Sequence, residues 1–294
     1  MAMEEKRPRP GVGAIDLSSV PRFGPRSRRR IAPFAAVCLV LIGLGAGTGL
    51  EAQTDFYNLD KNRPLRVEDA FATKRWAFEL QASPLTLSQD RGSDLLRYSP
   101  SLELKYALLP GLDVSAGTHL EVDRVGGETS TGLGKIELSS RANLWVESAT
   151  LPAVGTRVTG HVPTDSDESG WLEVRVMATR GLLGPVRAHV NGAWLQGEGR
   201  SEDWWAGLAL DYVLPFHHTL LLAETWLAEP RATDEDASRA LHTNVGFRFQ
   251  LSPTLAMDAG VGRGWAGPSR QDWSLTLGIT HEFAVRSLMP LRGG

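Results

Sequence analysis

Hydrophobic and polar side chains alternate along most of the chain, and the last such stretch shows the pattern most clearly. In residues 273–283, WSLTLGITHEF, the series that begins with Trp273 is apolar apart from His281, and the series that begins with Ser274 is small or polar. A repeat of two residues is that of a β-strand with two unlike faces. Such a strand fits a soluble sandwich, whose core takes the apolar face, or a membrane barrel, whose apolar face meets lipid.

Twelve segments carry this alternation, whereas the helical repeat is scarce. The predicted strands are residues 76–87, 96–107, 112–123, 133–147, 153–163, 171–179, 186–196, 204–213, 219–228, 240–250, 255–264 and 272–283. After residue 52 no stretch approaches the ~18 consecutive apolar residues of a spanning helix. The chain is therefore predicted to be all-β.

The segments between the predicted strands alternate between two kinds. Those of the first kind are short and combine proline with apolar residues, at 108–111, 149–152, 181–185, 214–218 and 251–254. Those of the second kind are polar and charged, at 88–94, 123–132, 165–170, 197–203, 229–239 and 265–272. Short periplasmic turns that alternate with longer outer loops are typical of barrels in the outer membrane. We therefore predict an up-and-down transmembrane β-barrel of about 12 antiparallel strands, with both ends of the mature chain in the periplasm.

The polar faces of several strands carry charges that would be costly in a dry core. In a membrane barrel these groups have to face the lumen, because lipid cannot satisfy them. The residues predicted to line the lumen are Glu103, Glu121, Glu137, Arg141, Arg157, His161, Glu173, Arg175, Arg187, His189, Arg248 and Glu282. As ion pairs they would brace the barrel, and the same charges would set the selectivity of a pore.

The first 52 residues have the order of a secretory signal peptide. Basic residues at 26–30 precede an uncharged run at 31–49, and Leu50-Glu51-Ala52 supplies a small residue before the cut at Gln53. An N-terminal membrane anchor is the alternative, because the run is nearly long enough to span a bilayer. Cleavage would remove the chain's one cysteine, Cys38, and leave 23 Lys and Arg against 30 Asp and Glu, a net charge of −7. That balance argues against a nucleic-acid partner.

The precursor is thus divided into a signal peptide (1–52), a periplasmic or plug segment (53–75), the barrel (76–283) and a C-terminal tail (284–294). The sequence leaves open whether the second of these segments is a short periplasmic helix or a plug. The last strand ends in an aromatic residue, Phe283, as the targeting strand of outer-membrane barrels typically does. We expect the outer membrane of a Gram-negative bacterium as the location, with its lipid and the barrel-assembly machinery as partners.

Three stretches of the mature chain resemble one family of outer-membrane barrels. They are NRPLRVEDAFATKRWAFELQ at 62–81, GLGKIELSSRANLW at 132–145 and GHVPTD at 160–165, with Lys135 and Asp165 as departures from the family pattern. The family is that of the transporter-like barrels named for a phenol-degradation (MetA) pathway. The resemblance implies an outer-membrane barrel that transports small molecules, aromatic or apolar compounds among them.

Two acidic loops contain the Asp-x-Asp spacing with which a calcium-binding loop begins. The candidate ligands of a divalent cation are Asp165, Asp167, Ser169, Asp234 and Asp236. The first loop has Val176 where a complete motif needs a bidentate glutamate. Since acidic loops are usually only solvated, metal binding is the weaker of the two interpretations.

No cofactor and no enzymatic activity are expected. The chain has no G-x-S-x-G motif, and GLGK at 132–135 lacks the other residues of a phosphate-binding loop. We predict a passive channel or transporter for a small-molecule substrate. The alternatives are a non-conducting structural barrel at the cell surface and an outer-membrane enzyme that modifies lipids.

Overall fold

A computed structural model describes residues 57–90, 94–215, 218–231, 239–267 and 271–285. The strands are β1 (Ala77–Asp90), β2 (Leu96–Tyr98), β3 (Ser101–Leu109), β4 (Leu112–Val125), β5 (Glu128–Leu133), β6 (Ile136–Trp145), β7 (Ala153–Val162), β8 (Trp171–Gly181), β9 (Val186–Gly197), β10 (Glu202–Val213), β11 (Thr219–Pro230), β12 (Ala240–Ser252), β13 (Leu255–Ala266) and β14 (Gln271–Ala284). Among the described residues, no helix is long and apolar enough to cross a membrane.

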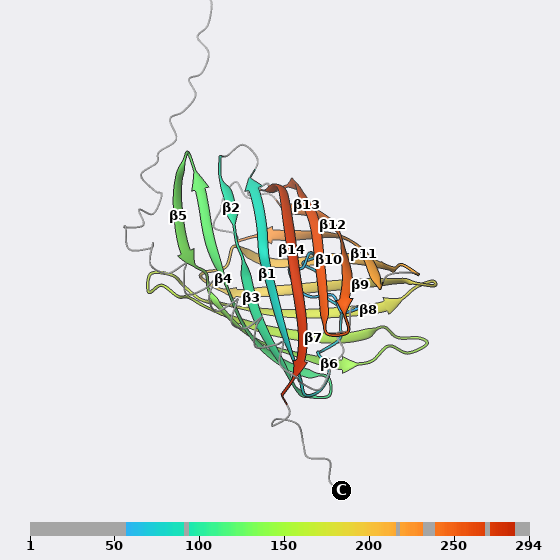
Figure 1. The fold of residues 1–294 in the computed structure, drawn as a ribbon. Helices are drawn as coiled ribbons and strands as arrows, with labels where there is room; N and C mark the ends of the chain where they lie inside the picture. The colour runs from blue at the N-terminus through green and yellow to red at the C-terminus, as the bar shows by residue number, and fades with distance from the viewer. Residues whose placement is uncertain (1–56, 91–93, 216–217, 232–238, 268–270, 286–294) are drawn as a thin grey trace, which may run out of the picture.

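The strands form one antiparallel barrel, which closes where β1 pairs with β14 from Ala77↔Ala284 onward. Figure 1 shows these two strands side by side, with the other strands following in chain order around the wall. β2 and β3 both pair with β1 and with β4, so they form one crossing that is interrupted beside Pro100. β5 and β6 both pair with β4 and form a second interrupted crossing. The fourteen strand segments thus make twelve crossings, and the predicted twelve-stranded all-β barrel is confirmed.

One predicted loop, 123–132, is wrong. β4 continues to Val125 and β5 begins at Glu128, so most of this segment is a hairpin. Its turn consists of Gly126 and Gly127, whose φ angles of 58° and 90° are both positive, as in the turns that match the twist of a hairpin. The polar composition of the segment concealed the strands, because β5 reads ETSTGL and has no apolar face of its own.

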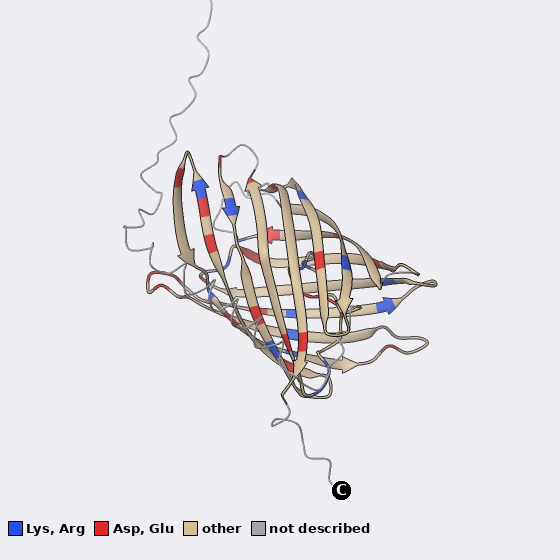
Figure 2. Cartoon of the chain, viewed as in Figure 1, with Lys and Arg blue, Asp and Glu red and all other residues tan. Residues whose placement is uncertain are grey.

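The apolar face of the strands lies on the outside of the barrel, and the polar face lies on the inside. In β14, Leu277 is exposed on the outside, whereas Thr276, Thr280 and Glu282 are buried on the inside. Exposed apolar side chains recur on the outer face of other strands, for example Leu138 and Val245. Figure 2 shows acidic and basic positions mixed on strands around the wall, and many of these side chains are buried.

Residues 57–76, which we call the inner loop, run inside the barrel and are buried over much of their length. At one end the carbonyl of Tyr57 accepts a hydrogen bond from Arg187, near the start of β9. At the other end the N–H of Trp76 donates to the carbonyl of Ala107 at 3.1 Å, near the end of β3. Both ends therefore lie where the short turns lie, which in an outer-membrane barrel is the periplasmic side.

The largest apolar cluster lies between the inner loop and the wall. Leu59, Leu65 and Val67 of the loop pack with Trp205 of β10 and Leu220 of β11, all at most 1% exposed. The space between the inner loop and strands β10 and β11 is therefore a packed apolar core, and the lumen is not empty at this depth.

Candidate functional site in the barrel lumen

The inner loop lies against the wall on nearly every side. Its residues meet the inward faces of β3, β4 and each strand from β6 to β14. A segment that reaches the wall around the circumference obstructs the lumen. Its described ends lie near the short turns, whereas Lys61 and Arg66 contact Glu137 and Glu202 near the outer ends of β6 and β10, so the loop extends from the periplasmic side into the outer half of the barrel.

Side chains of the wall satisfy the backbone of the inner loop, which forms no strand with the wall. The Glu224 carboxylate accepts the N–H groups of Arg66 and Val67, both at 2.8 Å. The Asn191 amide accepts the N–H of Glu68 at 2.9 Å and donates to the carbonyl of the same residue at 2.8 Å. Buried backbone groups need such partners, so the wall specifies the conformation of the loop.

Glycines on the inward face leave room for the loop. A Cβ atom on Gly260 would stand 2.4 Å from the Cβ of Pro64, and one on Gly207 would stand 2.6 Å from a methyl carbon of Val67. A Cβ atom on Gly155 would stand 2.7 Å from a carbonyl oxygen of the loop. Protein interiors are close-packed, so a side chain at these positions would displace the loop or distort the wall.

Three arginines on neighbouring strands, which we call the arginine ladder, are Arg141 of β6, Arg157 of β7 and Arg175 of β8. Strand pairing places Arg157 directly opposite the other two, and all three are at most 2% exposed. Like charges in direct opposition destabilise a sheet. Glu68 of the inner loop offsets them: Arg175 donates to its carboxylate, Nη2 of Arg157 lies 2.9 Å away and Nη1 of Arg141 lies 3.9 Å away.

Asp60 is a second ionic anchor of the inner loop. Its carboxylate accepts from Lys105 at 2.7 Å and from Arg248 at 2.8 Å, and it lies 3.3 Å from the guanidinium of Arg63. Burial alone would raise the pKa of Asp60, but the Lys105, Arg248 and Arg63 cations around it hold that pKa well below its usual range. These three cations favour the ionised carboxylate of Asp60, so ion pairs hold the loop at two separate points, Asp60 and Glu68.

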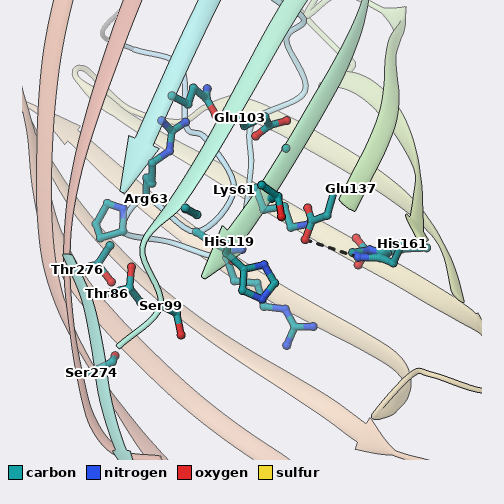
Figure 3. Close-up of a pocket in the computed structure, with 18 of the residues that line it drawn as sticks. Lys61, Arg63, Thr86, Ser99, Glu103, His119, Glu137, His161, Ser274 and Thr276 are labelled. Carbon is teal, nitrogen blue, oxygen red and sulfur yellow. Dashed lines mark hydrogen bonds and ion pairs between the residues drawn. The ribbon is translucent and has the colours of Figure 1, made fainter. Parts of the chain in front are cut away.

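A cavity of about 530 Å³ lies on the outer side of the inner loop. Its floor includes Lys61, Arg63 and Arg66 of the loop, and its wall includes carboxylates, hydroxyls and two imidazoles. Figure 3 shows Lys61 and Glu137 meeting in the cavity, with the Lys61 Nζ atom 2.9 Å from the Glu137 carboxylate. The ring of His161 lies 3.5 Å from the other oxygen of that carboxylate. The cavity thus presents a polar and electrically mixed surface.

Arg66 is enclosed by aromatic and acidic side chains at the edge of this cavity. Its guanidinium carbon lies 4.3 Å from the ring centroid of Trp205 and 4.4 Å from that of Trp226. Its two terminal nitrogens donate to the carboxylate of Glu202 at 3.3 and 2.6 Å. The two aromatic rings and the carboxylate that accepts two hydrogen bonds suit the planar guanidinium of Arg66 and would suit the ammonium group of a lysine less well.

The structure places the residues predicted to line the lumen at three depths. Those that line the cavity are Glu103, Glu121, Glu137, His161, Glu173 and Arg175. Those buried against the inner loop below it are Arg141, Arg157 and Arg248. Those nearest the short turns are Arg187 and His189, which contact Asp211, and Glu282, which is buried opposite Glu79.

Sequence reasoning found one partner of these cations, Glu173, which pairs with Arg175, and missed the others. The missed partners come from the inner loop, as Asp60 and Glu68, and from wall positions, as Asp113 and Asp211. One signal was available: extrapolating the pairing outward from the short turn between 145 and 153 already sets two arginines opposite each other. Such a pair demands a buried anion, which a carboxylate of segment 53–75 such as Glu68 could supply.

The candidate metal ligands do not assemble into a site in the described residues. Asp165, Asp167 and Ser169 lie in the exposed segment between β7 and β8, where the Asp165 carboxylate accepts the N–H of Asp167 at 3.2 Å. Asp234 and Asp236 lie outside the described residues. Within the described part of the chain, no three His, Cys, Asp or Glu side chains come together as a metal site requires.

Comparisons with solved structures agree with this architecture. The chain is similar to the COG4313 outer membrane channel from Pseudomonas putida F1, with 14% sequence identity over 76% of this chain and 100% of that chain and a TM-score of 0.61. It is also similar to the KdgM porin, with 9% identity over 70% and 98% of the two chains and a TM-score of 0.47. For the NanC porin the values are 9%, 71%, 100% and 0.48. No protein-family model and no curated protein sequence matches the chain.

The closed antiparallel barrel has the fold of the COG4313 outer membrane channel, and the predicted fold class is confirmed. Its structural neighbours are outer-membrane channels and porins. The resemblance to the MetA barrels has no support from family models, so the fold is shown and the family is not.

Proposed function

We propose that the protein is a passive channel for small polar solutes, in which the inner loop serves as an internal plug. The observation that carries the proposal is a cavity with a charged and hydroxylated lining that ends on a loop filling the lumen. The resemblance suggested aromatic or apolar solutes, but such solutes would have to pass carboxylates and guanidinium groups. Polar solutes match these groups better.

The inner loop is attached in a way that is compatible with movement. It joins the wall through one covalent connection, at the start of β1, and through side-chain contacts, and it contributes no rung to the ladders of the closed sheet. Removing the loop from the lumen would therefore break no hydrogen bond between wall strands. Both of its described ends lie near the short turns, so it could leave toward the periplasm.

A disulfide between the inner loop and the wall tests this proposal. We choose V67C/G207C, because a Cβ atom on Gly207 would stand 2.6 Å from a Val67 methyl carbon, within the reach of a disulfide. The mature chain carries no other cysteine if the signal peptide is cleaved. We expect small or rare conductance steps from the oxidised variant in a planar bilayer, and larger and more frequent steps after reduction.

The single variants V67C and G207C are the matched controls, since reductant should not alter their conductance. A folded barrel migrates differently on a gel when unheated and when boiled. A double variant that shows this difference but does not conduct before or after reduction would contradict the channel proposal. That result would favour a non-conducting barrel, the second candidate, which the dense docking of the inner loop supports. Steady conductance of the oxidised variant would instead mean that the loop does not obstruct the lumen.

A further inference from the structure

The wall supplies one carboxylate too few for the three arginines of the arginine ladder. Asp113 of the wall lies 2.9 Å from a terminal nitrogen of Arg141, and Glu173 of the wall lies 2.6 Å from one of Arg175. In the described residues, the carboxylate within ion-pair distance of Arg157 is that of Glu68, which belongs to the inner loop. Without the loop the wall would present three cations to two carboxylates.

Two donors of the ladder also have unused hydrogen-bonding capacity. The Nε atom of Arg157 and the Nη1 atom of Arg141 are buried and donate no hydrogen bond to any described residue. A buried N–H without an acceptor costs free energy, so the ladder is not fully satisfied even with Glu68 in place. Glu68 is one carboxylate in a site with donors for more than one.

The ladder is also adjacent to the cavity. Arg175 lines the cavity and at the same time donates to the buried carboxylate of Glu68. A solute in the cavity would therefore meet the ladder at Arg175 and reach Arg157 once the loop has moved. Guanidinium forks bind carboxylates in a planar, paired geometry, which selects this anion by shape as well as by charge.

We infer that the arginine ladder is a binding site for the carboxylate of a solute, and that Glu68 occupies it while the inner loop is docked. The solute and Glu68 then compete for Arg157, so a carboxylate solute favours the undocked loop and a neutral one does not. This inference rests on the proposed channel function, because the solute would have to enter the lumen. Its test, however, does not require conduction.

The test measures how fast a membrane-impermeant maleimide labels the single variant V67C in the refolded barrel. Val67 is fully buried in the docked loop, so labelling reports undocking. We expect propionate, at constant ionic strength, to raise the labelling rate roughly fivefold or more, the lower end of the usual coupling between two ligands. Propionamide, the neutral analogue of the same shape, should leave the rate unchanged.

Arg157 is the residue that the inference singles out. In V67C/R157Q the propionate effect should disappear, while in V67C/R263Q it should persist, because Arg263 faces outward over Trp265. If R157Q does not fold, R157K serves in its place, since it keeps the charge and loses the fork, and the propionate effect should shrink. Equal effects of propionate and propionamide, or an unchanged effect in the folded R157 variant, would overturn the inference.

The two proposals fail in different ways. A barrel that never conducts but shows carboxylate-dependent labelling would remove the channel and keep the anion site. A barrel that conducts when the V67C/G207C disulfide is reduced, but whose labelling ignores propionate, would keep the channel and remove the anion site.

Discussion

At the scale of single residues, the docked loop depends on what the wall omits as much as on what it provides. Gly260 and Gly207 leave volumes that Pro64 and Val67 fill. Such positions have little tolerance, since adding atoms to a packed contact typically costs about 1–3 kcal/mol. The wall glycines can therefore be used to loosen the loop without removing a charge.

We predict that Gly260→Ala weakens docking of the inner loop. The added Cβ would stand 2.4 Å from Pro64 and 3.0 Å from a backbone oxygen of Val245. Trypsin should then cleave the loop after Lys61 and Arg66, which the intact barrel protects, at a rate about 5- to 150-fold higher, as expected for a cost of about 1–3 kcal/mol.

Gly192→Ala is the matched control, because nothing lies within 4 Å of a Cβ atom there. Its cleavage rate should equal that of the wild type. Mass spectrometry of the fragments identifies the cut sites. Equal protection of the Gly260 variant would show that the loop shifts within the lumen without leaving it.

The residue scale also shows where sequence reasoning stops. The side that Arg141, Arg157 and Arg175 face follows from the period of two, so placing them in the lumen needs only the pattern. That Glu68 meets them does not follow, because the inner loop has no periodicity and its path is set by wall side chains such as Glu224 and Asn191. A loop specified by tertiary contacts has no local signal.

At the scale of elements, strand positions were predictable because each crossing repeats the alternation of an apolar and a polar face. The interruptions were not predicted, although Pro100 marks one of them, since proline cannot donate to a ladder. The β4–β5 hairpin was missed for a different reason. Its outer part extends beyond the end of β7, and in the described residues β5 pairs with β4 alone. A strand in this position has no apolar face, so it lacks the alternation that marked the other strands.

We predict that the turn of this hairpin stabilises the hairpin alone. In G126A/G127A both alanines would have to adopt positive φ angles, at a cost of about 1–2 kcal/mol per residue. Trypsin cleavage after Arg124 should become faster, while the gel mobility of the unheated barrel should not change. The control G126N keeps the Asn-Gly pair that such turns favour and should resemble the wild type. Loss of the folded gel band in G126A/G127A would mean that the hairpin is needed for closure.

At the scale of the whole molecule, the wall and the inner loop form two systems with different kinds of bonding. The wall closes through backbone ladders from β1 round to β14, and lipid surrounds its apolar face. The loop is held by side chains, through Asp60 and Glu68 among the buried cations and through Val67 in the apolar cluster. Closure is thus independent of the loop, whereas charge balance in the lumen is not.

This separation predicts the behaviour of a barrel from which residues 57–75 are deleted. It should fold and keep the mobility difference between unheated and boiled samples, because no wall ladder is lost. Its unfolding temperature should fall, since Arg157, Lys105 and Arg248 lose carboxylates that now lie within 2.9 Å. The cost per cation should remain below the roughly 3–5 kcal/mol of a broken buried pair, because water enters the emptied lumen.

Adding R157Q to the deletion should recover part of the lost stability, while adding R263Q should recover none. If the deletion variant cannot fold under conditions in which the wild type does, the inner loop is part of the folding core, and a plug that leaves the lumen is excluded.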